Sequence, residues 1–274
     1  MTTPTSSFAR IAAFQALKGQ RNLVCLTAYT APMASALNPY CDLLLVGDSV
    51  GMAVYGMDTT HNVDLQMMIR HGQAVMRRRQ NALVVVDLPK GSYEDNPEQA
   101  LHSGQLVITK TGADAVKLEG GADRAATLSY LCGKGIQVMG HIGLLPQSAT
   151  AMRATGQTAA EADQLAADMR AVIAAGVFSV VIEGVIEPVA GKLAAACRVP
   201  TIGIGASAAC DGQILVTDDM LGLYDGHTPK FVRPFAVLKQ DIAAAAKAYR
   251  AAVIDGTFPD KREIYLKTLI DRKN

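Results

Sequence analysis

The sequence has 274 residues, 50% of them apolar, which excludes a disordered or fibrous chain and permits one large buried core. Lys and Arg total 26 against 25 Asp and Glu, and tryptophan is absent, so the chain offers neither a basic groove nor stacking aromatic residues for nucleic acid. A small molecule is therefore the expected partner.

A short helical extension is predicted at the N-terminus, and seven short, almost continuously apolar runs follow it. Runs that do not alternate between apolar and polar residues are typical of strands buried on both faces. The predicted strands cover residues 23–28, 42–46, 83–86, 115–118, 136–139, 178–182 and 201–204. An eighth strand over 213–216 is the weakest prediction, because the run is short and the next segment is rich in turn signals.

Helical patterns separate the predicted strands, as in residues 65–76, where apolar residues recur with the 3.6-residue period. Asn96 followed by Pro97 is a typical helix start, and Thr158 with Glu161 has the spacing of a capping box. An alanine-rich helix over residues 235–254 is predicted to close the chain.

This alternation of strands and helices predicts an α/β protein, either a closed barrel or an open doubly wound sheet. The (β/α)8 TIM barrel is favoured, because eight units fit about 250 residues and no G-x-G-x-x-G motif opens the first strand-to-helix turn. Residues 1–274 are expected to form a single catalytic domain.

The cysteines and the N-terminus bear on location. The five cysteines are scattered and form no Cys-x-x-Cys pair, which indicates reduced thiols. No run approaches the ~18 apolar residues that a membrane span needs, and the N-terminus lacks the apolar core of a signal peptide. We therefore expect a cytoplasmic protein without membrane contact.

Polar and charged residues gather at the carboxyl ends of the predicted strands. They are Asp48, Ser49, Asp87, Lys117, Glu119, His141 and Glu183. In a barrel all of these positions converge on one mouth, which is where barrel enzymes place their chemistry.

Each of these residues also has a structural interpretation. Asp48 could cap a helix, although the next helical pattern starts only near Asp64, and Asp87 could be a turn residue. Lys117 and Glu119 share one strand face, so they could form a structural ion pair, but the inward placement avoids burying charge under the helices.

His141 and Glu183 are weighed in the same way. A lone histidine is more often a satisfied core residue, so His141 is assigned a supporting role. Glu183 is either hydrogen-bonded structure or a general base, and its expected place at the mouth favours the base. The glycine-rich segment at residues 201–207 could cradle a phosphate, although close backbone packing explains it equally well.

Two aspartates without a cysteine or histidine cluster make a site of hard oxygen ligands. Such a site suits Mg2+ that keeps some of its waters, and suits Zn2+ poorly. A 2-oxo acid would offer a matching pair of oxygens, so Asp48 and Asp87 are predicted to hold Mg2+ together with this type of substrate.

Six segments in one order carry a family resemblance. They are VGDSVGM at 46–52, DLP at 87–89, VKLEGG at 116–121, GHIGLLPQ at 140–147, VIEGV at 181–185 and IGIGASAACDGQILV at 202–216. Over residues 23–258 the sequence closely resembles the ketopantoate hydroxymethyltransferase family. Each motif alone is a hypothesis, but six motifs in the same order argue against chance agreement.

The resemblance implies a Mg2+-dependent barrel that transfers a hydroxymethyl group from 5,10-methylenetetrahydrofolate to 3-methyl-2-oxobutanoate. The product would be ketopantoate (2-dehydropantoate) in pantothenate and coenzyme A biosynthesis, formed through a Mg2+-stabilised enolate. The resemblance also implies a homo-oligomer, commonly a decamer.

Residue roles follow from the same resemblance. Asp48, Asp87 and Glu119 look like metal ligands, the last directly or through water. Ser49 and Lys117, with the two aspartates, look like the groups that bind the substrate, and Glu183 looks like the general base.

The sequence departs from the family pattern at two places. Lys90 and Gly91 follow DLP where apolar residues are usual, so a charge is expected near the edge of the pocket. Residues 148–158 lack the usual Gly-Gly-aromatic stretch in an expected lid, which bears on folate binding.

Two other functions compete with this one. Metal-dependent lyases and mutases also act on 2-oxo acids at a barrel mouth, but their K-x-C-G-H loop is absent from this sequence. A barrel that has lost its chemistry is disfavoured, because buried charges are costly to keep without use.

Overall fold

The computed structural model describes residues 6–149, 151–223 and 229–265. Its centre is a closed barrel of eight parallel strands in the order β1 to β8, with β8 pairing back onto β1. The strands are β1 Leu23–Thr27, β2 Leu43–Val46, β3 Leu83–Asp87, β4 Ala115–Lys117, β5 Val138–Gly143, β6 Ser179–Glu183, β7 Thr201–Ile204 and β8 Gly212–Leu215. The predicted TIM barrel is confirmed, including its weakest strand.

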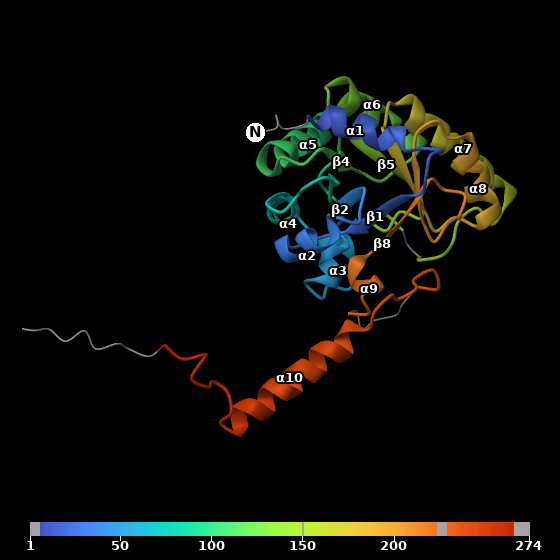
Figure 1. The fold of residues 1–274 in the computed structure, drawn as a ribbon. Coiled ribbons are helices and arrows are strands. Elements are labelled where there is room, and N and C mark those ends of the chain that lie inside the picture. The colour runs from blue at the N-terminus through green and yellow to red at the C-terminus, as the bar shows by residue number, and fades with distance from the viewer. Residues whose placement is uncertain (1–5, 150, 224–228, 266–274) are drawn as a thin grey trace, which may run out of the picture.

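Helices pack around this barrel (Figure 1). The longer ones are α1 Ser7–Ala16, α2 Ala31–Leu37, α4 Leu65–Met76, α5 Pro97–Thr111, α6 Ala125–Gly133, α7 Ala159–Ala174, α8 Glu187–Ala196 and α10 Leu238–Ile254. The shorter ones are α3 Val50–Ala53, α9 Thr217–Met220 and the 3-10 turns η1 Thr60–Asn62 and η2 Ala122–Arg124. No helix in the described ranges has the length and apolar character needed to cross a membrane.

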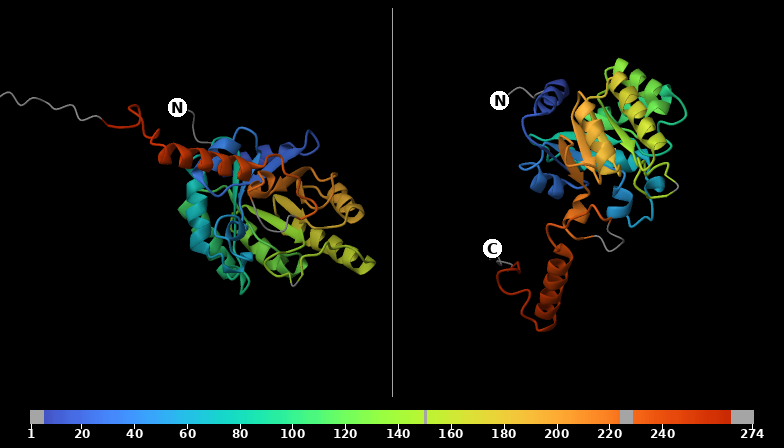
Figure 2. Two further views of the ribbon diagram at one scale, coloured as in Figure 1. Left: turned by 90° about the horizontal axis from the view of Figure 1, so that it is seen from below. Right: turned by 90° about the vertical axis from the view of Figure 1, so that its right-hand side faces the viewer.

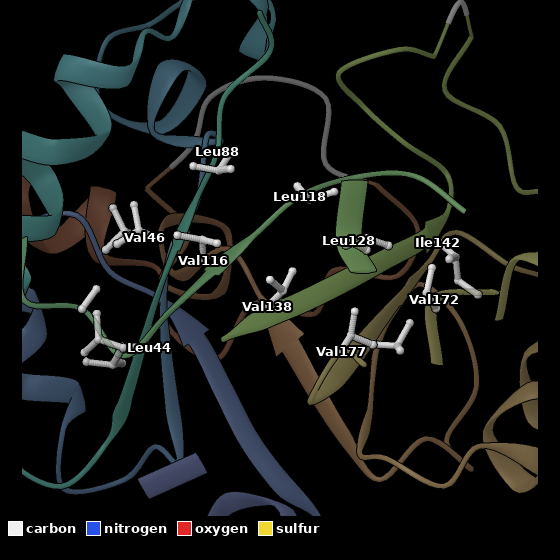
Figure 3. Packing of buried hydrophobic residues seen from close by; sticks show 14 of the residues in the cluster. Leu44, Val46, Leu88, Val116, Leu118, Leu128, Val138, Ile142, Val172 and Val177 are labelled. Atoms are coloured by element: carbon white, nitrogen blue, oxygen red, sulfur yellow. The ribbon is translucent and has the colours of Figure 1, made fainter. Parts of the chain in front are cut away.

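Alternate residues of each strand face two different apolar layers. Leu43 and Leu45 of β2 belong to the cluster inside the barrel, whereas Leu44 and Val46 belong to the cluster between the strands and the helices. Figure 3 shows side chains of this second layer, among them Leu44 and Val46. Because both faces are buried, the strands read as continuous apolar runs in the sequence.

Helix α1 closes the amino-terminal end of the barrel. Its Gln15 Nε2 donates to the carbonyl oxygen of Phe178 at 3.0 Å, just before β6, and Lys18 forms an ion pair with Asp211 before β8. Arg10 of the same helix pairs with the buried Asp114, which also accepts from Arg79 at 2.9 Å. The helical extension predicted at the N-terminus therefore covers the amino-terminal end of the barrel, and the carboxyl-terminal end remains open for a functional site.

The predicted helix starts are confirmed at two places. Asn96 Oδ1 accepts from the Gln99 amide at 2.8 Å, and Thr158 Oγ1 accepts from the Glu161 amide at 3.2 Å. The Glu161 carboxylate does not complete the capping box on the Thr158 amide but accepts from Gln157, one residue earlier.

Two expectations about the strands and helices near the mouth are wrong. The fifth strand is Val138–Gly143 rather than 136–139, because it stays paired with β6 through His141. A helix follows Asp48 at once, since α3 begins at Val50, although no helix was expected before Asp64. Four residues are too few to show a 3.6-residue apolar period.

Helix α10 projects away from the barrel, as Figures 1 and 2 show. None of its residues is buried, and Ile242, Tyr249 and Ile254 are each more than half exposed. It begins at Leu238 rather than at the predicted Phe235. The amides of both of these residues donate to carbonyl groups of Met220 and Leu221, which ties the preceding segment to α9.

Candidate active site

A cavity of about 180 Å³ lies at the carboxyl ends of the strands. All seven charged or polar residues singled out at the strand ends line it: Asp48, Ser49, Asp87, Lys117, Glu119, His141 and Glu183. Their predicted convergence on one mouth is confirmed. The cavity is completed by apolar side chains that include Leu45, Val181, Ile204 and Ile214.

The strand register explains why these side chains enter the cavity. Four of them lie two residues beyond a member of the inner apolar layer, and successive residues of a strand alternate between faces. Lys117 follows Ala115 in this way, and Asp87, His141 and Glu183 follow Val85, Met139 and Val181. The inward face thus changes from apolar to charged at the carboxyl end of the barrel. The inward placement expected for Lys117 is confirmed.

Asp87 joins the ends of three strands. Its Oδ1 lies 2.8 Å from Lys117 Nζ, and its Oδ2 accepts from the backbone amide of Asp48 at 3.2 Å. Burial raises the pKa of Asp87, while the charge of Lys117 acts in the opposite direction. Lys117 therefore forms its ion pair with Asp87 of the neighbouring strand β3, not with Glu119 as the structural interpretation supposed; Glu119 lies just beyond the end of β4.

Ser49 is held by a residue that the sequence did not single out. Its Oγ lies 2.8 Å from the hydroxyl of Tyr29, a buried residue. Ser49 stands at the N-terminus of α3, but its side chain makes no capping hydrogen bond there. The Ser49 hydroxyl is therefore free of a helix-capping role and lines the cavity beside Asp48.

Glu119 and Glu183 lie on either side of His141. His141 Nδ1 is 3.6 Å from Glu119 Oε1, and its Nε2 is 3.3 Å from Glu183 Oε2. Burial lowers the pKa of the histidine, with the charge of Lys117 acting in the same direction. A neutral His141 between two carboxyl groups suits the supporting role predicted for it, and gives Glu183 a neighbour that sequence order did not reveal.

The donor set fits a hard divalent cation. The cavity is lined by five carboxyl groups (Asp48, Asp87, Glu119, Glu183 and Asp219) and a single ammonium group, that of Lys117, and burial raises the pKa of Glu119 to about 9. A bound cation would offset this concentration of buried negative charge. In the described ranges no three acidic, histidine or cysteine side chains are grouped closely enough to hold an ion by themselves. The site therefore suits Mg2+ that completes its shell with waters and substrate oxygens.

Titration of Glu119 should be visible in the stability of the metal-free protein. A folded-state pKa near 9, against an ordinary value of 4.5, means that only the folded state keeps this proton between those pH values. The free energy of unfolding should then fall as pH rises through this window, by up to about 1.4 kcal/mol per pH unit.

Thermal unfolding in EDTA between pH 6 and 9 measures this slope. We expect Tm of the wild type to decline more steeply than Tm of Glu119→Gln, and added Mg2+ to reduce the difference. Parallel curves for the two proteins in EDTA would show that Glu119 ionises normally.

Like Tyr29, Gln147 and Tyr93 have important contacts and were missed at the sequence level. Gln147 is buried and its side chain donates to Asp48 Oδ2 at 2.9 Å, while its own Oε1 accepts from the Tyr93 hydroxyl at 2.6 Å. Gln147 ends the GHIGLLPQ motif, which was the available signal, but as a neutral loop residue it did not stand out.

The glycine-rich segment around β7 is explained by close packing. A Cβ on Gly205, which has a φ of +57°, would lie 2.6 Å from the ring of Phe231. A Cβ on Gly203 would lie 3.1 Å from Cys210 Sγ. The structure thus gives a packing reason for these glycines and adds nothing in favour of a phosphate cradle.

The first departure from the family pattern does not reach the cavity. Lys90 is exposed and lines a neighbouring groove with His61 and Asp64, so the charge expected at the pocket edge lies outside it. Gly91 has a φ of +84°, which favours glycine. In the second departure, Met152 lines the cavity and Arg153 pairs with Glu161.

Comparison with known proteins gives a family match over nearly the whole chain. The family model described as Ketopantoate hydroxymethyltransferase matches residues 9–261. The 3-methyl-2-oxobutanoate hydroxymethyltransferase of Paramagnetospirillum magneticum is 55% identical over 248 residues, which cover 89% of this chain and 90% of that protein. The enzyme of the same name from Brucella canis is 50% identical and covers 92% of each chain.

Solved structures of lower similarity share the fold. A 2,3-dimethylmalate lyase, described as a member of the PEP mutase/isocitrate lyase superfamily, has a TM-score of 0.61 at 15% identity and covers 96% of this chain and 93% of its own. A phosphonopyruvate hydrolase in complex with oxalate and Mg2+ has a TM-score of 0.62 at 11% identity, covering 94% and 93%. At these identities the likeness is one of fold alone.

Proposed function

Because the chain belongs to the ketopantoate hydroxymethyltransferase family, it is a hydroxymethyltransferase, and we propose that it takes the one-carbon unit from 5,10-methylenetetrahydrofolate with the help of Mg2+. The acceptor would be 3-methyl-2-oxobutanoate and the product ketopantoate. The observation that carries the proposal is that Asp48, Asp87, Lys117 and Glu119 line the same cavity. Glu183 lines it from β6, on the opposite wall of the barrel.

Substrate binding would use the polar groups around Asp87. The Ser49 hydroxyl and the Lys117 ammonium group are donors that suit the carboxylate and keto oxygens of a 2-oxo acid. Asp48 and Asp87 would hold Mg2+, with Glu119 as a further ligand directly or through water, and the bound ion supplies Lewis-acid polarisation of those oxygens. The apolar residues Val181 and Ile214 in the cavity wall suit the branched alkyl end of the substrate.

Glu183 would act as the general base. It would take the proton from C3 of 3-methyl-2-oxobutanoate, and Lys117 would stabilise the negative charge that develops on the keto oxygen. His141, within 3.3 Å of Glu183, would hold the carboxyl group in place. The enolate carbon would then bond to the methylene carbon of the folate as one of its two C–N bonds breaks. Water would replace the remaining C–N bond, which gives the hydroxyl group of the product and releases tetrahydrofolate.

Proton exchange tests the first half of this reaction. The protein is incubated with 3-methyl-2-oxobutanoate and Mg2+ in D2O without folate, and the C3 proton signal is followed by NMR. We expect exchange that depends on Mg2+. Its absence with the wild-type protein would argue for another substrate.

Addition of 5,10-methylenetetrahydrofolate tests the second half and separates this function from its competitors. We expect ketopantoate to form, whereas a lyase or mutase would cleave or rearrange its own acid and leave the folate unchanged. Consumption of the acid without the folate would favour the lyases, whose fold this chain shares.

We further propose that the protein works as a homo-oligomer in the cytoplasm, within pantothenate and coenzyme A biosynthesis. The exposed apolar side chains of α10, among them Ile242, Tyr249 and Ile254, support a second copy of this chain as their partner. Mass photometry of the full chain should give a decamer. A truncation after residue 236 should lower the subunit number, and an unchanged assembly would mean that α10 is not at an interface.

A further inference from the structure

The side chain of Gln147, a buried residue four positions after the end of β5, makes three hydrogen bonds. Its Nε2 donates to Asp48 Oδ2 at 2.9 Å and to the Leu88 carbonyl oxygen at 3.1 Å. Its Oε1 accepts from the Tyr93 hydroxyl at 2.6 Å. Gln147 and Tyr93 are 2% and 3% exposed, so water does not compete for these bonds.

The partners determine which way the carboxamide points. The Leu88 carbonyl oxygen and an ionised Asp48 can only accept, so they must face the amide nitrogen. The Tyr93 hydroxyl must then donate to the amide oxygen. A flipped amide would set two acceptors against the carbonyl oxygen of Gln147, so one orientation is strongly preferred.

The backbone of the same residue reaches a second carboxyl group of the cavity. The Gln147 amide donates to Glu119 Oε2 at 3.1 Å. The chain turns immediately afterwards, with the Ser148 and Ala149 amides donating to the Leu145 carbonyl oxygen at 3.0 and 2.8 Å. One residue on a braced turn therefore spans two acidic groups that come from different parts of the barrel.

We infer that Gln147 is a positioning residue that presents Asp48 and Glu119 to the metal, with Tyr93 fixing its orientation. The amide donates to Asp48 Oδ2 and so fixes the rotation of the carboxyl group that would face the metal. The amide is neutral and adds no charge to a cavity that five carboxyl groups already line. This inference rests on the Mg2+ site of the proposed function.

Contacts of this kind are expected to act on metal affinity more than on chemistry. Groups that orient metal ligands typically contribute 10- to 100-fold in affinity. If Gln147 positions only the ligands, saturating metal should restore most of the rate, because the groups that touch the substrate are unchanged. A general loss of structure would lower the rate at every metal concentration.

The test is Gln147→Met in the full chain, which keeps the length of the side chain but removes its donor. Mn2+ binding is titrated by EPR, which reads free Mn2+ without any turnover. We expect the Kd for Mn2+ to rise about 10- to 100-fold, while kcat at saturating Mn2+ stays within a few-fold of the wild type.

Two further variants keep the test independent of folding. Tyr93→Phe removes only the donor that orients the amide and should raise the Kd for Mn2+ by a few-fold. Gln15→Met is the matched control, because its Nε2 also donates to a carbonyl oxygen, that of Phe178, at the opposite end of the barrel. The control should bind Mn2+ like the wild type.

The outcomes separate the inference from the function on which it rests. Wild-type Mn2+ affinity in both Gln147→Met and Tyr93→Phe would overturn the inference and leave the proposed metal site standing. A fall in kcat that saturating Mn2+ does not restore would also overturn it, since Gln147 would then act on the chemistry. No Mn2+ binding by the wild type would overturn the metal site itself and the inference with it.

Discussion

Glu183→Gln is expected to slow exchange of the C3 proton of 3-methyl-2-oxobutanoate by about 100- to 10,000-fold, the usual contribution of a positioned general base. The amide keeps the size of the side chain but cannot accept the proton. Lys117 and the four other carboxyl groups of the cavity are untouched, so substrate and metal should still bind. The exchange rate in D2O, followed by NMR, gives the result directly.

Glu187→Gln is the matched control for this prediction. Glu187 lies four residues further on, at the start of α8, where its carboxylate accepts from Ser207 Oγ at 3.0 Å outside the cavity. The control should exchange the proton at the wild-type rate. If Glu183→Gln kept more than a tenth of the wild-type rate, another group would have to remove the proton.

The architecture and most of the cavity could be predicted from the sequence, because both depend on local patterns. Buried parallel strands read as apolar runs, and a charge placed two residues beyond an inward-facing apolar residue must lie on the same face. Asp87 after LVVV and Lys117 after Ala115 follow this rule. Their contact with each other did not follow, since it depends on which strands are neighbours and in what register.

What could not be predicted depends on contacts between distant parts of the chain. Gln147 bonds to Asp48, 99 residues away, and Tyr29 to Ser49 across two strand ends. Neither Gln147 nor Tyr29 is charged, so nothing in its local sequence separates it from an ordinary loop or core residue. The extent of β5 was missed for a related reason, because Gly140 and Gly143 look like strand breakers until β6 is there to pair with them.

Asp87→Asn is expected to abolish turnover while leaving the fold intact. Asp87 connects the Asp48 backbone, the Lys117 ammonium group and the predicted metal position, so its charge acts on all three. Asparagine keeps the shape and an oxygen for the Asp48 amide, but weakens the hold on Mg2+ and on Lys117. Lys117 still has the Asp48 carboxyl group nearby to compensate its charge, which is why the barrel should survive.

Asp114→Asn, at the other end of the barrel, is expected to lower stability without lowering activity. Asp114 is buried and pairs with Arg10 and Arg79, so its loss should cost about 3–5 kcal/mol of stability, as for other broken buried ion pairs. Its kcat and Mn2+ affinity should remain those of the wild type, whereas Asp87→Asn should lose both with little change in Tm. Full activity of Asp87→Asn would remove Asp87 from the metal site. A large fall in the Tm of Asp87→Asn would instead make the Asp87 to Lys117 pair mainly structural, because Asp48 alone would then be unable to hold Lys117.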